Sequence, residues 1–315
     1  GPAVAAGCTM ILKPAGETPL TALAIVDILE RCGLPKGVLN VILPAKTGPA
    51  IAKILHDSRV KNLSFTGSTQ VGKILLKEAA DQVIRCSMEL GGNAPFVVLD
   101  DANIEEAVKG LMMAKMRNGG AACTAANRIY VARSIGEKFI AEFAKAMAAL
   151  KMGVGREAGT QLGASVSMKE RNKIAELVDA SKARGAKVHL GGATPDGAGA
   201  FYPATVLEVK KDDAILAEEV FGPVAPVVLF DTDEEALKLA NDTEYGLISY
   251  VYSEDLKRAI RFAEGLEAGM VGINRGLLSD PAAPFGGVKQ SGLGREGGFD
   301  GVHEFLQTKY IGVEI

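Results

Sequence analysis

Short apolar runs alternate with longer runs of helical periodicity along most of this chain, and no other feature constrains the fold as much. In the first part of the chain, strand-like runs cover residues 9–13, 38–43 and 62–65, and helix-like runs cover residues 19–33, 49–55 and 69–80. Strands that alternate with helices predict a parallel sheet with helices on both faces. The expected class is therefore α/β.

The same alternation continues beyond Asn93. The expected strands are residues 95–99, 128–132, 187–190, 224–230, 249–252 and 269–274. The expected helices are residues 104–116, 135–151, 167–184, 233–240 and 256–264. Residues 304–315 alternate imperfectly between apolar and polar side chains, which predicts an edge strand. An exposed edge strand needs a partner, so we expect a homo-oligomer, a dimer or a tetramer.

Composition excludes several classes of protein. A chain of 315 residues with 48% hydrophobic and 23% charged residues can bury a substantial core and hold more than one domain. The formal net charge of −3 offers no basic surface for nucleic acid. No apolar run reaches the roughly 18 residues of a membrane span. The four cysteines lack paired spacing, which predicts neither a disulfide framework nor a metal site and favours a cytoplasmic setting.

One cysteine lies in a loop of small residues between a helix-like and a strand-like run. Residues 117–128 read RNGGAACTAANR, with Cys123 as the sulfur. Small residues let a ligand approach the sulfur, and glycine allows backbone conformations that other residues resist. Arg117 and Arg128 flank the loop, and a nearby cation lowers the pKa of a thiol. Cys123 is therefore either a nucleophile or a small buried hydrophobe, which is the commoner role of a free cysteine.

A second stretch places a carboxylate where a turn begins. Glu89 lies near the end of the apolar run 83–90 and directly before Leu90, Gly91 and Gly92. A carboxylate there is either a charge at the edge of a loop or a general base for water. A nucleophile and a base are the minimum set for forming and hydrolysing a covalent acyl intermediate.

Together the two stretches resemble the aldehyde dehydrogenase superfamily. Residues 89–95, ELGGNAP, match its glutamate motif E-L-G-G-x-x-P, and residues 118–123, NGGAAC, match its cysteine motif N-x-G-Q-x-C except at Ala121, where the family usually has Gln. Three further matches are FTGST at residues 65–69, EEVFGP at residues 218–223 and PFGG at residues 284–287. Five motifs in the family's order cover nearly the whole chain.

The resemblance implies a domain organisation and a reaction. Residues 1–91 would be the C-terminal part of a Rossmann-type dinucleotide-binding domain, residues 92–290 an α/β catalytic domain, and residues 291–315 a return segment with an oligomerisation strand. The Cys123 thiolate would attack an aldehyde, hydride would leave for the nicotinamide, and Glu89 would deprotonate the water that hydrolyses the thioester.

The resemblance also implies a cofactor, NAD or NADP. Gly67 and Ser68 would contact its diphosphate at a strand-to-helix turn, where a helix N-terminus favours anions. Lys13 would reach the adenosine ribose; without the family it would be a solvated charge at a strand end. Glu219 and Phe221 would hold the nicotinamide ribose and ring; otherwise they are a charged turn and a core aromatic.

Gly16 bears on the choice between the two cofactors. Many NAD-preferring relatives have a Glu at this position, which binds the ribose 2′-hydroxyl and repels a 2′-phosphate. With glycine there and Lys13 nearby, the sequence leaves NADP open.

The substrate follows from one branch of the family. In succinate-semialdehyde dehydrogenases an Arg and a Ser at the positions of Arg117 and Ser279 hold the remote carboxylate, with Phe285 beside them in the PFGG motif. Arginine suits bidentate carboxylate binding. Arg117 could instead be a cation that favours the C-terminus of a helix. Ala125 stands where that branch often has a second cysteine, so we expect no disulfide switch in the loop.

Alternative functions remain open. A CoA-acylating relative is disfavoured because it needs no base such as Glu89. A catalytically silent assembly subunit is supported only by Ala121 and by the expected lack of the family's N-terminal portion. A general or other semialdehyde dehydrogenase would retain the same chemistry. The opening GPAVAAG resembles an internal segment of the family, so we expect the chain to begin inside a longer protein. The family's second oxyanion donor, an Asn, would then precede Gly1.

Overall fold

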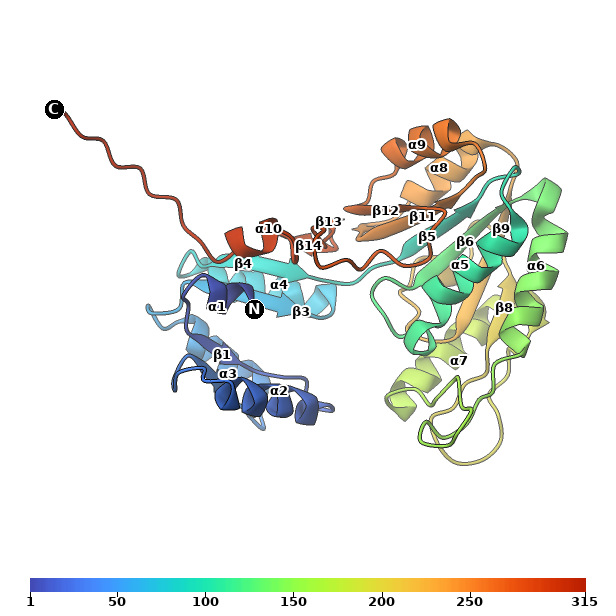
Figure 1. The fold of residues 1–315 in the computed structure, drawn as a ribbon. Coiled ribbons are helices and arrows are strands. Elements are labelled where there is room, and N and C mark those ends of the chain that lie inside the picture. Colours follow the sequence, from blue (N-terminus) through green and yellow to red (C-terminus); the bar gives the residue numbers. More distant parts are fainter. The chain divides into compact units, whose positions relative to one another are not determined.

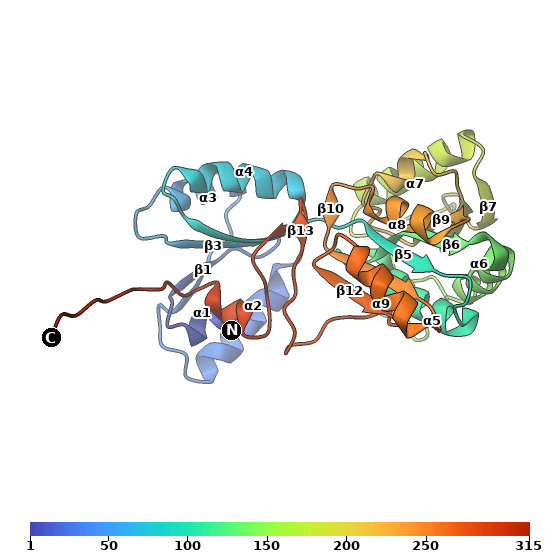
Figure 2. The same cartoon turned by 90° about the horizontal axis from the view of Figure 1, so that it is seen from above.

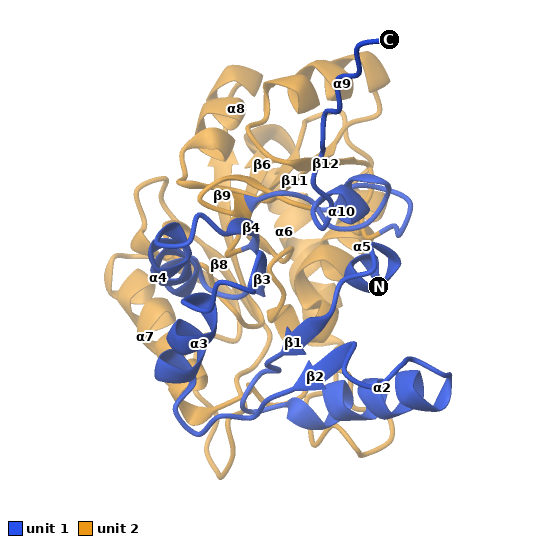
Figure 3. Cartoon of the chain, turned by 90° about the vertical axis from the view of Figure 1, so that its left-hand side faces the viewer, with its two compact units in different colours: residues 1–89, 280–285, 293–315 blue, residues 90–279, 286–292 orange.

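The computed structural model of the chain describes residues 1–315 and divides into two compact units (Figure 3). Unit 1 comprises residues 1–89, 280–285 and 293–315, and unit 2 comprises residues 90–279 and 286–292. The chain therefore passes between the units more than once. No helix in either unit combines the length and the apolar character that crossing a bilayer requires.

Unit 2 is built on a seven-stranded sheet with the order β12-β11-β5-β6-β9-β8-β7 (Figure 1). Neighbouring strands are parallel except for β7, which runs antiparallel to β8. The strands are β5 (Ala94–Val98), β6 (Ala126–Ala132), β7 (Lys187–Leu190), β8 (Thr205–Glu208), β9 (Val224–Phe230), β11 (Ile248–Tyr252) and β12 (Met270–Ile273). All residues of β5, β6 and β11 are buried, which is expected of strands covered on both faces.

Helices cover both faces of this sheet, and Figure 2 shows them from above. On one face α5 (Ile104–Met116) packs against α6 (Arg133–Ala148). Helices α7 (Met168–Ala183), α8 (Asp233–Asn241) and α9 (Leu256–Gly265) contribute side chains to one large apolar cluster. Short elements complete the unit: η1 (Arg117–Gly120), η2 (Ala214–Leu216), β10 (Tyr245–Gly246) and β13 (Val288–Lys289). The strand β14 (Gly292–Leu293) lies where the chain re-enters unit 1.

Local sequence explains where these helices begin. The side chains of Asn103, Ser167, Thr232 and Asp255 each accept a hydrogen bond from a backbone N–H in the first turn of α5, α7, α8 and α9. Such caps satisfy donors that have no partner inside the helix. The predicted α/β class with a parallel sheet is thus confirmed for unit 2.

Unit 1 has fewer residues than unit 2 and a much smaller buried apolar cluster. Its strands β1 (Met10–Leu12) and β2 (Leu39–Val41) form one parallel pair, and β3 (Asn62–Thr66) and β4 (Arg85–Glu89) form another. Its helices are α1 (Pro2–Ala5), α2 (Pro19–Arg31), α3 (Thr47–Leu55), α4 (Thr69–Ala80) and α10 (Asp300–His303). Leu55, Ala79 and Ile84 form its small buried cluster. Both pairs are parallel, as the alternation of strands and helices predicts, and the two pairs belong to separate sheets.

Two parts of unit 1 leave apolar side chains exposed. Helix α2 buries none of its residues, and Leu20 is 77% exposed. The predicted strand at residues 304–315 is absent: after α10 the chain has no regular structure, and Tyr310 and Val313 are 92% and 78% exposed. A strand requires a hydrogen-bonded neighbour, and this segment has no such neighbour within the chain.

Candidate active site

Three of the sequence motifs lie side by side in unit 2 because of the order of its strands. Gly91–Asn93 directly precede β5, the cysteine loop precedes β6, and residues 218–223 precede β9. Since β5, β6 and β9 are parallel neighbours in the sheet, the segments that lead into them meet at its amino-terminal edge. The topology therefore gathers the loops of Cys123 and Glu219 at one place.

Glycines allow these three segments to touch backbone to backbone. A Cβ on Gly92 would lie 2.4 Å from the Cys123 carbonyl oxygen, and a Cβ on Gly120 would lie 2.1 Å from the Gly222 carbonyl oxygen. The Gly92 N–H also donates to Glu219 Oε1 over 2.9 Å. Any larger residue at Gly92 or Gly120 would push the loops apart, because backbone atoms cannot yield as a side-chain tip can.

The cysteine loop is shaped by three consecutive left-handed residues. Helix α5 ends at Met116, and Asn118, Gly119 and Gly120 then have φ values of 54°, 63° and 82°. Asn118 tolerates this conformation better than most residues, and its Nδ2 donates to the Ala121 carbonyl oxygen over 2.9 Å. The loop therefore retains an internal hydrogen bond even though Ala121 replaces the usual Gln.

The sulfur-bearing segment is held from two sides. Cys123 is half-buried and its neighbour Thr124 is buried. The Tyr250 hydroxyl donates to the Thr124 carbonyl oxygen over 2.8 Å. Arg117 Nη2 donates to Thr124 Oγ1 over 3.0 Å. The structure thus places Arg117 beside the residue that follows the sulfur.

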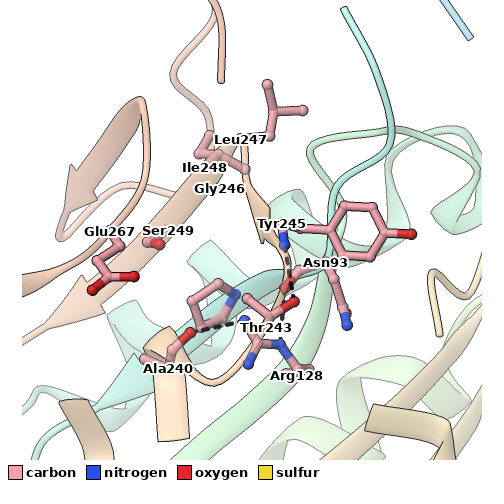
Figure 4. A pocket seen from close by; sticks show the side chains of 11 residues that line it. Asn93, Arg128, Ala240, Thr243, Tyr245, Gly246, Leu247, Ile248, Ser249 and Glu267 are labelled. Carbon is pink, nitrogen blue, oxygen red and sulfur yellow. Dashed lines mark hydrogen bonds between the residues drawn. The ribbon is translucent and has the colours of Figure 1, made fainter. Parts of the chain in front are cut away.

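Arg128 has a different role from the one expected. Its guanidinium is buried and donates to the carbonyl oxygens of Asn93, Leu239 and Ala240, each over 2.9 Å. Figure 4 shows Arg128 with Asn93 and Ala240. The charge of Arg128 is also 5.8 Å from the centre of the Tyr130 ring. Arg128 therefore ties β6 to the start of β5 and the end of α8, and the expectation that it serves as a cation for the thiol is wrong.

Sequence reasoning missed a buried lysine under the loops. Lys115 on α5 is fully buried, and its Nζ donates to Asn127 Oδ1 over 2.9 Å and to the Val220 carbonyl oxygen over 3.4 Å. Burial lowers the pKa of Lys115 to about 7, and the charge of Glu219 opposes that shift. The position had a signal: Lys115 follows the buried Leu111 by four residues, so it falls on the core stripe of its helix.

Glu219 is half-buried, and its charge acts on the buried Lys115. Burial raises the pKa of its carboxyl, and the Gly92 N–H, Lys173 and Lys115 in turn act against that rise. Next to it, Phe221 is 39% exposed, so its ring is available at the surface of the unit. These are properties that suit a carboxylate and an aromatic ring that receive a ligand.

Ser279 lies on an exposed loop that is anchored to the helix of Arg117. A Cβ on Gly276 would lie 2.0 Å from the carbonyl oxygen of Gly110, so this loop crosses the middle of α5 in direct contact. Arg117 follows the same helix directly at its C-terminal end. The loop of Ser279 and the backbone of Arg117 are therefore both attached to α5.

Unit 1 holds the predicted base. Glu89 ends β4, its side chain is buried, and its Oε2 has no hydrogen-bond partner. Burial raises the pKa of Glu89 to about 8; Glu296 adds to the rise and Arg295 opposes it. A buried carboxyl with a pKa near the working pH is a typical general base.

The predicted diphosphate turn lies next to this base. The Gly67 N–H donates to the Glu89 carbonyl oxygen over 3.0 Å. Ser68 caps the twelve-residue helix α4, and its side chain accepts from the Val71 N–H over 3.4 Å. Lys13 is half-buried directly after β1. The amino end of α4 therefore offers N–H groups and a helix dipole to an anion.

Phe285 belongs to unit 1 and its backbone is fixed. It exchanges two backbone hydrogen bonds with Glu296, of 2.6 Å and 2.7 Å.

The predicted site residues are divided between the two units. Unit 2 contains Cys123, Arg117, Ser279, Glu219 and Phe221, whereas unit 1 contains Glu89, Gly67, Ser68, Lys13 and Phe285. Each half of the predicted site is thus coherent within its unit, and the pairing of the sulfur with the carboxylate stays a prediction.

Known proteins share this sequence and fold. Residues 1–311 match the model of the aldehyde dehydrogenase family. The chain is 53% identical over 313 residues to a succinate-semialdehyde dehydrogenase of Paenarthrobacter nicotinovorans, which covers 99% of this chain and 70% of the relative. It is 46% identical over 315 residues to a glutarate-semialdehyde dehydrogenase of Pseudomonas putida, and the match covers 100% of this chain and 65% of that relative. The crystal structure of a succinate-semialdehyde dehydrogenase from Burkholderia pseudomallei has a TM-score of 0.95 at 45% identity, and covers 97% of this chain and 63% of that one.

Proposed function

Because the chain belongs to the aldehyde dehydrogenase family, we propose that the protein oxidises an aldehyde to a carboxylic acid with NAD or NADP as the hydride acceptor. The chain spans about two-thirds of the length of the relatives named above, so the activity is proposed for the protein that contains it. The observation that carries the proposal is the convergence of the Gly92, Cys123 and Glu219 segments at one edge of the unit 2 sheet.

The residues present fit a nicotinamide dinucleotide. The capped amino end of α4 at Gly67 and Ser68 suits a diphosphate, and Lys13 suits the adenosine ribose. Glu219 and Phe221 offer a carboxylate to the nicotinamide ribose and a ring to its base. When bound, the cofactor accepts the hydride that leaves the aldehyde carbon.

The residues of this chain carry the remaining steps. The Cys123 thiolate attacks the carbonyl carbon and forms a C–S bond, while its own backbone N–H is a donor for the resulting oxyanion. Loss of hydride from that carbon leaves a thioester. Glu89 then takes a proton from water, the hydroxide attacks the acyl carbon, and the C–S bond breaks to restore the thiolate.

We infer that the aldehyde carries a carboxylate, most simply succinate semialdehyde. Arg117 lies beside the cysteine segment with forked donors that match a carboxylate, and the loop that carries Ser279 contacts helix α5 at Gly276. The 53% identical relative is a succinate-semialdehyde dehydrogenase, and the relative named for glutarate semialdehyde is 46% identical. Phe285 would line the aldehyde channel. Glutarate semialdehyde and uncharged aldehydes are the alternatives.

The choice of cofactor rests on Gly16. Nothing lies within 4 Å of a Cβ built on this residue, and its backbone does not require glycine. A 2′-phosphate would therefore meet neither a carboxylate nor a steric block from this position. We propose that the protein accepts NADP as well as NAD.

We also propose a homo-oligomer of a cytoplasmic enzyme with no nucleic-acid or membrane partner. The exposed apolar side chains of residues 310–315 support the first part, because an extended segment of this kind gains hydrogen bonds and burial when a neighbouring subunit provides a strand. Size-exclusion chromatography with and without residues 307–315 tests it: loss of the oligomer on truncation is expected, and an unchanged size would contradict it.

Steady-state turnover of succinate semialdehyde tests the function. Cys123→Ala should abolish formation of the thioester, and Glu89→Gln should allow one burst of hydride transfer but slow hydrolysis. Cys86→Ala is a matched control, because Cys86 is also half-buried but lies in unit 1 outside the motifs. Release of an acyl-CoA in place of the acid would favour the acylating alternative. No turnover of any aldehyde, with cofactor binding intact, would favour the silent assembly subunit.

A further inference from the structure

Thr124 is fixed more firmly than an ordinary loop residue. Its carbonyl oxygen accepts from the Tyr250 hydroxyl over 2.8 Å, and Tyr250 is only 1% exposed on the fully buried strand β11. The Tyr250 ring packs against Phe96 on β5, with ring centroids 5.7 Å apart. The residue directly after the sulfur is therefore attached to the sheet.

The side chain of Thr124 holds Arg117. Its Oγ1 accepts from Arg117 Nη2 over 3.0 Å, and Thr124 itself is 7% exposed. A branched Cβ restricts the threonine to few rotamers, so the hydroxyl is a fixed acceptor. Arg117 lies at the exposed end of α5, where a long side chain would otherwise sample many rotamers. This bond uses one of five guanidinium N–H donors and leaves a fork for a ligand.

We propose that Thr124 is a positioning residue that sets the span between Cys123 Sγ and the Arg117 guanidinium, and thereby selects the chain length of the carboxylated aldehyde. The inference rests on the proposed function and deepens it. A nucleophile and a carboxylate clamp that are both tied to one residue are separated by a constant distance. An aldehyde bound at both ends must match that distance, so one methylene more or less is disfavoured.

A purely structural role for the hydroxyl makes a different prediction. If the bond only stabilised the end of α5, its loss would lower the stability of the protein and affect every aldehyde equally. If it positions Arg117, its loss weakens only substrates that carry a carboxylate, and it weakens the preferred length most. Substrates with and without the carboxylate therefore separate the two roles.

The test compares Thr124→Val, which keeps the branched shape and removes the acceptor, with Thr124→Ser, which keeps the acceptor. Each variant is assayed with succinate semialdehyde, glutarate semialdehyde and butanal. Thr124→Val should raise KM for the preferred semialdehyde by about tenfold, as expected for loss of one hydrogen bond to a charged group. It should change kcat little and should bring the kcat/KM values of the two semialdehydes closer together. Thr124→Ser should stay near the wild type.

A second readout does not depend on turnover. Isothermal titration with succinate, which carries the same remote carboxylate, should show the same weakening in Thr124→Val and not in Thr124→Ser. An unchanged ratio of the two semialdehydes in Thr124→Val, or an equal loss with butanal, would overturn the inference. If the wild-type protein itself showed no preference for carboxylated aldehydes, the proposed substrate class would fail first and the inference would fall with it.

Discussion

Replacing the buried Lys115 by methionine should remove a specific pH dependence of stability. Methionine has a similar length and no charge, so the change keeps the packing of α5 while it deletes a titrating group. It also leaves Asn127 Oδ1 and the Val220 carbonyl oxygen without the Nζ donor, which costs about 1–3 kcal/mol. Absolute stability is therefore a poor test of the lysine's charge state, and its dependence on pH is a good one.

The size of the effect follows from the pKa of Lys115. In the folded protein this pKa is about 7 instead of the ordinary 10.5, a difference worth roughly 5 kcal/mol. Between these values the unfolded chain binds more protons than the folded one, so the stability contributed by Lys115 increases as the pH rises from about 7 to about 10.5. From pH 7 to pH 9 the gain is about 2 kcal/mol. Lys115→Met should lack it.

Tyrosine fluorescence during urea unfolding measures the stability of unit 2, which contains Lys115. The chain has no tryptophan, and of its six tyrosines Tyr130, Tyr202, Tyr245, Tyr250 and Tyr252 lie in unit 2. Tyr310 is 92% exposed and contributes little to the transition. The free energy of unfolding is compared between wild type and variant at pH 7, 8 and 9. Glu89 titrates in the same range, but it is present in both proteins and cancels from the comparison.

Lys109→Met is the control, since Lys109 is on the same helix and exposed, where it pairs with Glu105 and Glu106. It should show the pH dependence of the wild type. The reasoning is refuted if the stability difference between wild type and Lys115→Met is the same at pH 7 and pH 9. That result would mean that the folded lysine keeps an ordinary pKa despite its burial.

Three further predictions concern the site. Turnover limited by thioester hydrolysis should rise with pH up to about 8 as Glu89 ionises, and Glu89→Gln should lower kcat by about 10²- to 10⁴-fold and remove that rise, as a pH–rate profile would show. Gly120→Ala should destabilise unit 2 by at least about 1–3 kcal/mol in urea titrations, because its φ of 82° and the Gly222 carbonyl oxygen 2.1 Å away both oppose a Cβ; an unchanged midpoint would contradict this. Gly16→Glu should raise the KM for NADP and leave that for NAD nearly unchanged, whereas an equal effect on both cofactors would argue against a 2′-phosphate near this residue.

Local sequence was sufficient to predict the bounds of a helix whose first turn is capped by its own preceding residue. The predicted bounds of α4 and α5 match the structure, because Ser68 and Asn103 cap their first turns. It failed where a strand depends on distant partners. The segment 304–315 has the alternation of a strand but no neighbour in the chain. Val83, expected to begin a strand, is 90% exposed with φ of 52°, and β4 begins at Arg85.

The motifs of the candidate site could be recognised in the sequence, but the hydrogen bonds that hold their loops could not. Cys123 was singled out from its loop of small residues and Glu219 from the resemblance to the family's motif, and the strand order then explains why their loops meet. The bond from Tyr250 to Thr124 joins residues 126 positions apart, and no local pattern reports such a pair. Arg128 was misjudged for a related reason: its place next to the loop in sequence says nothing about the direction of its side chain, which runs into the core.

The crossing of backbones at Gly92 and Gly120 has a practical consequence for anyone who wishes to redirect this scaffold to another aldehyde. A combinatorial library should leave both positions untouched, since any larger residue there would displace the loop of Cys123. Variation is better concentrated on Ser279 and Arg117, whose side chains are exposed and can be exchanged without rebuilding the chain beneath them.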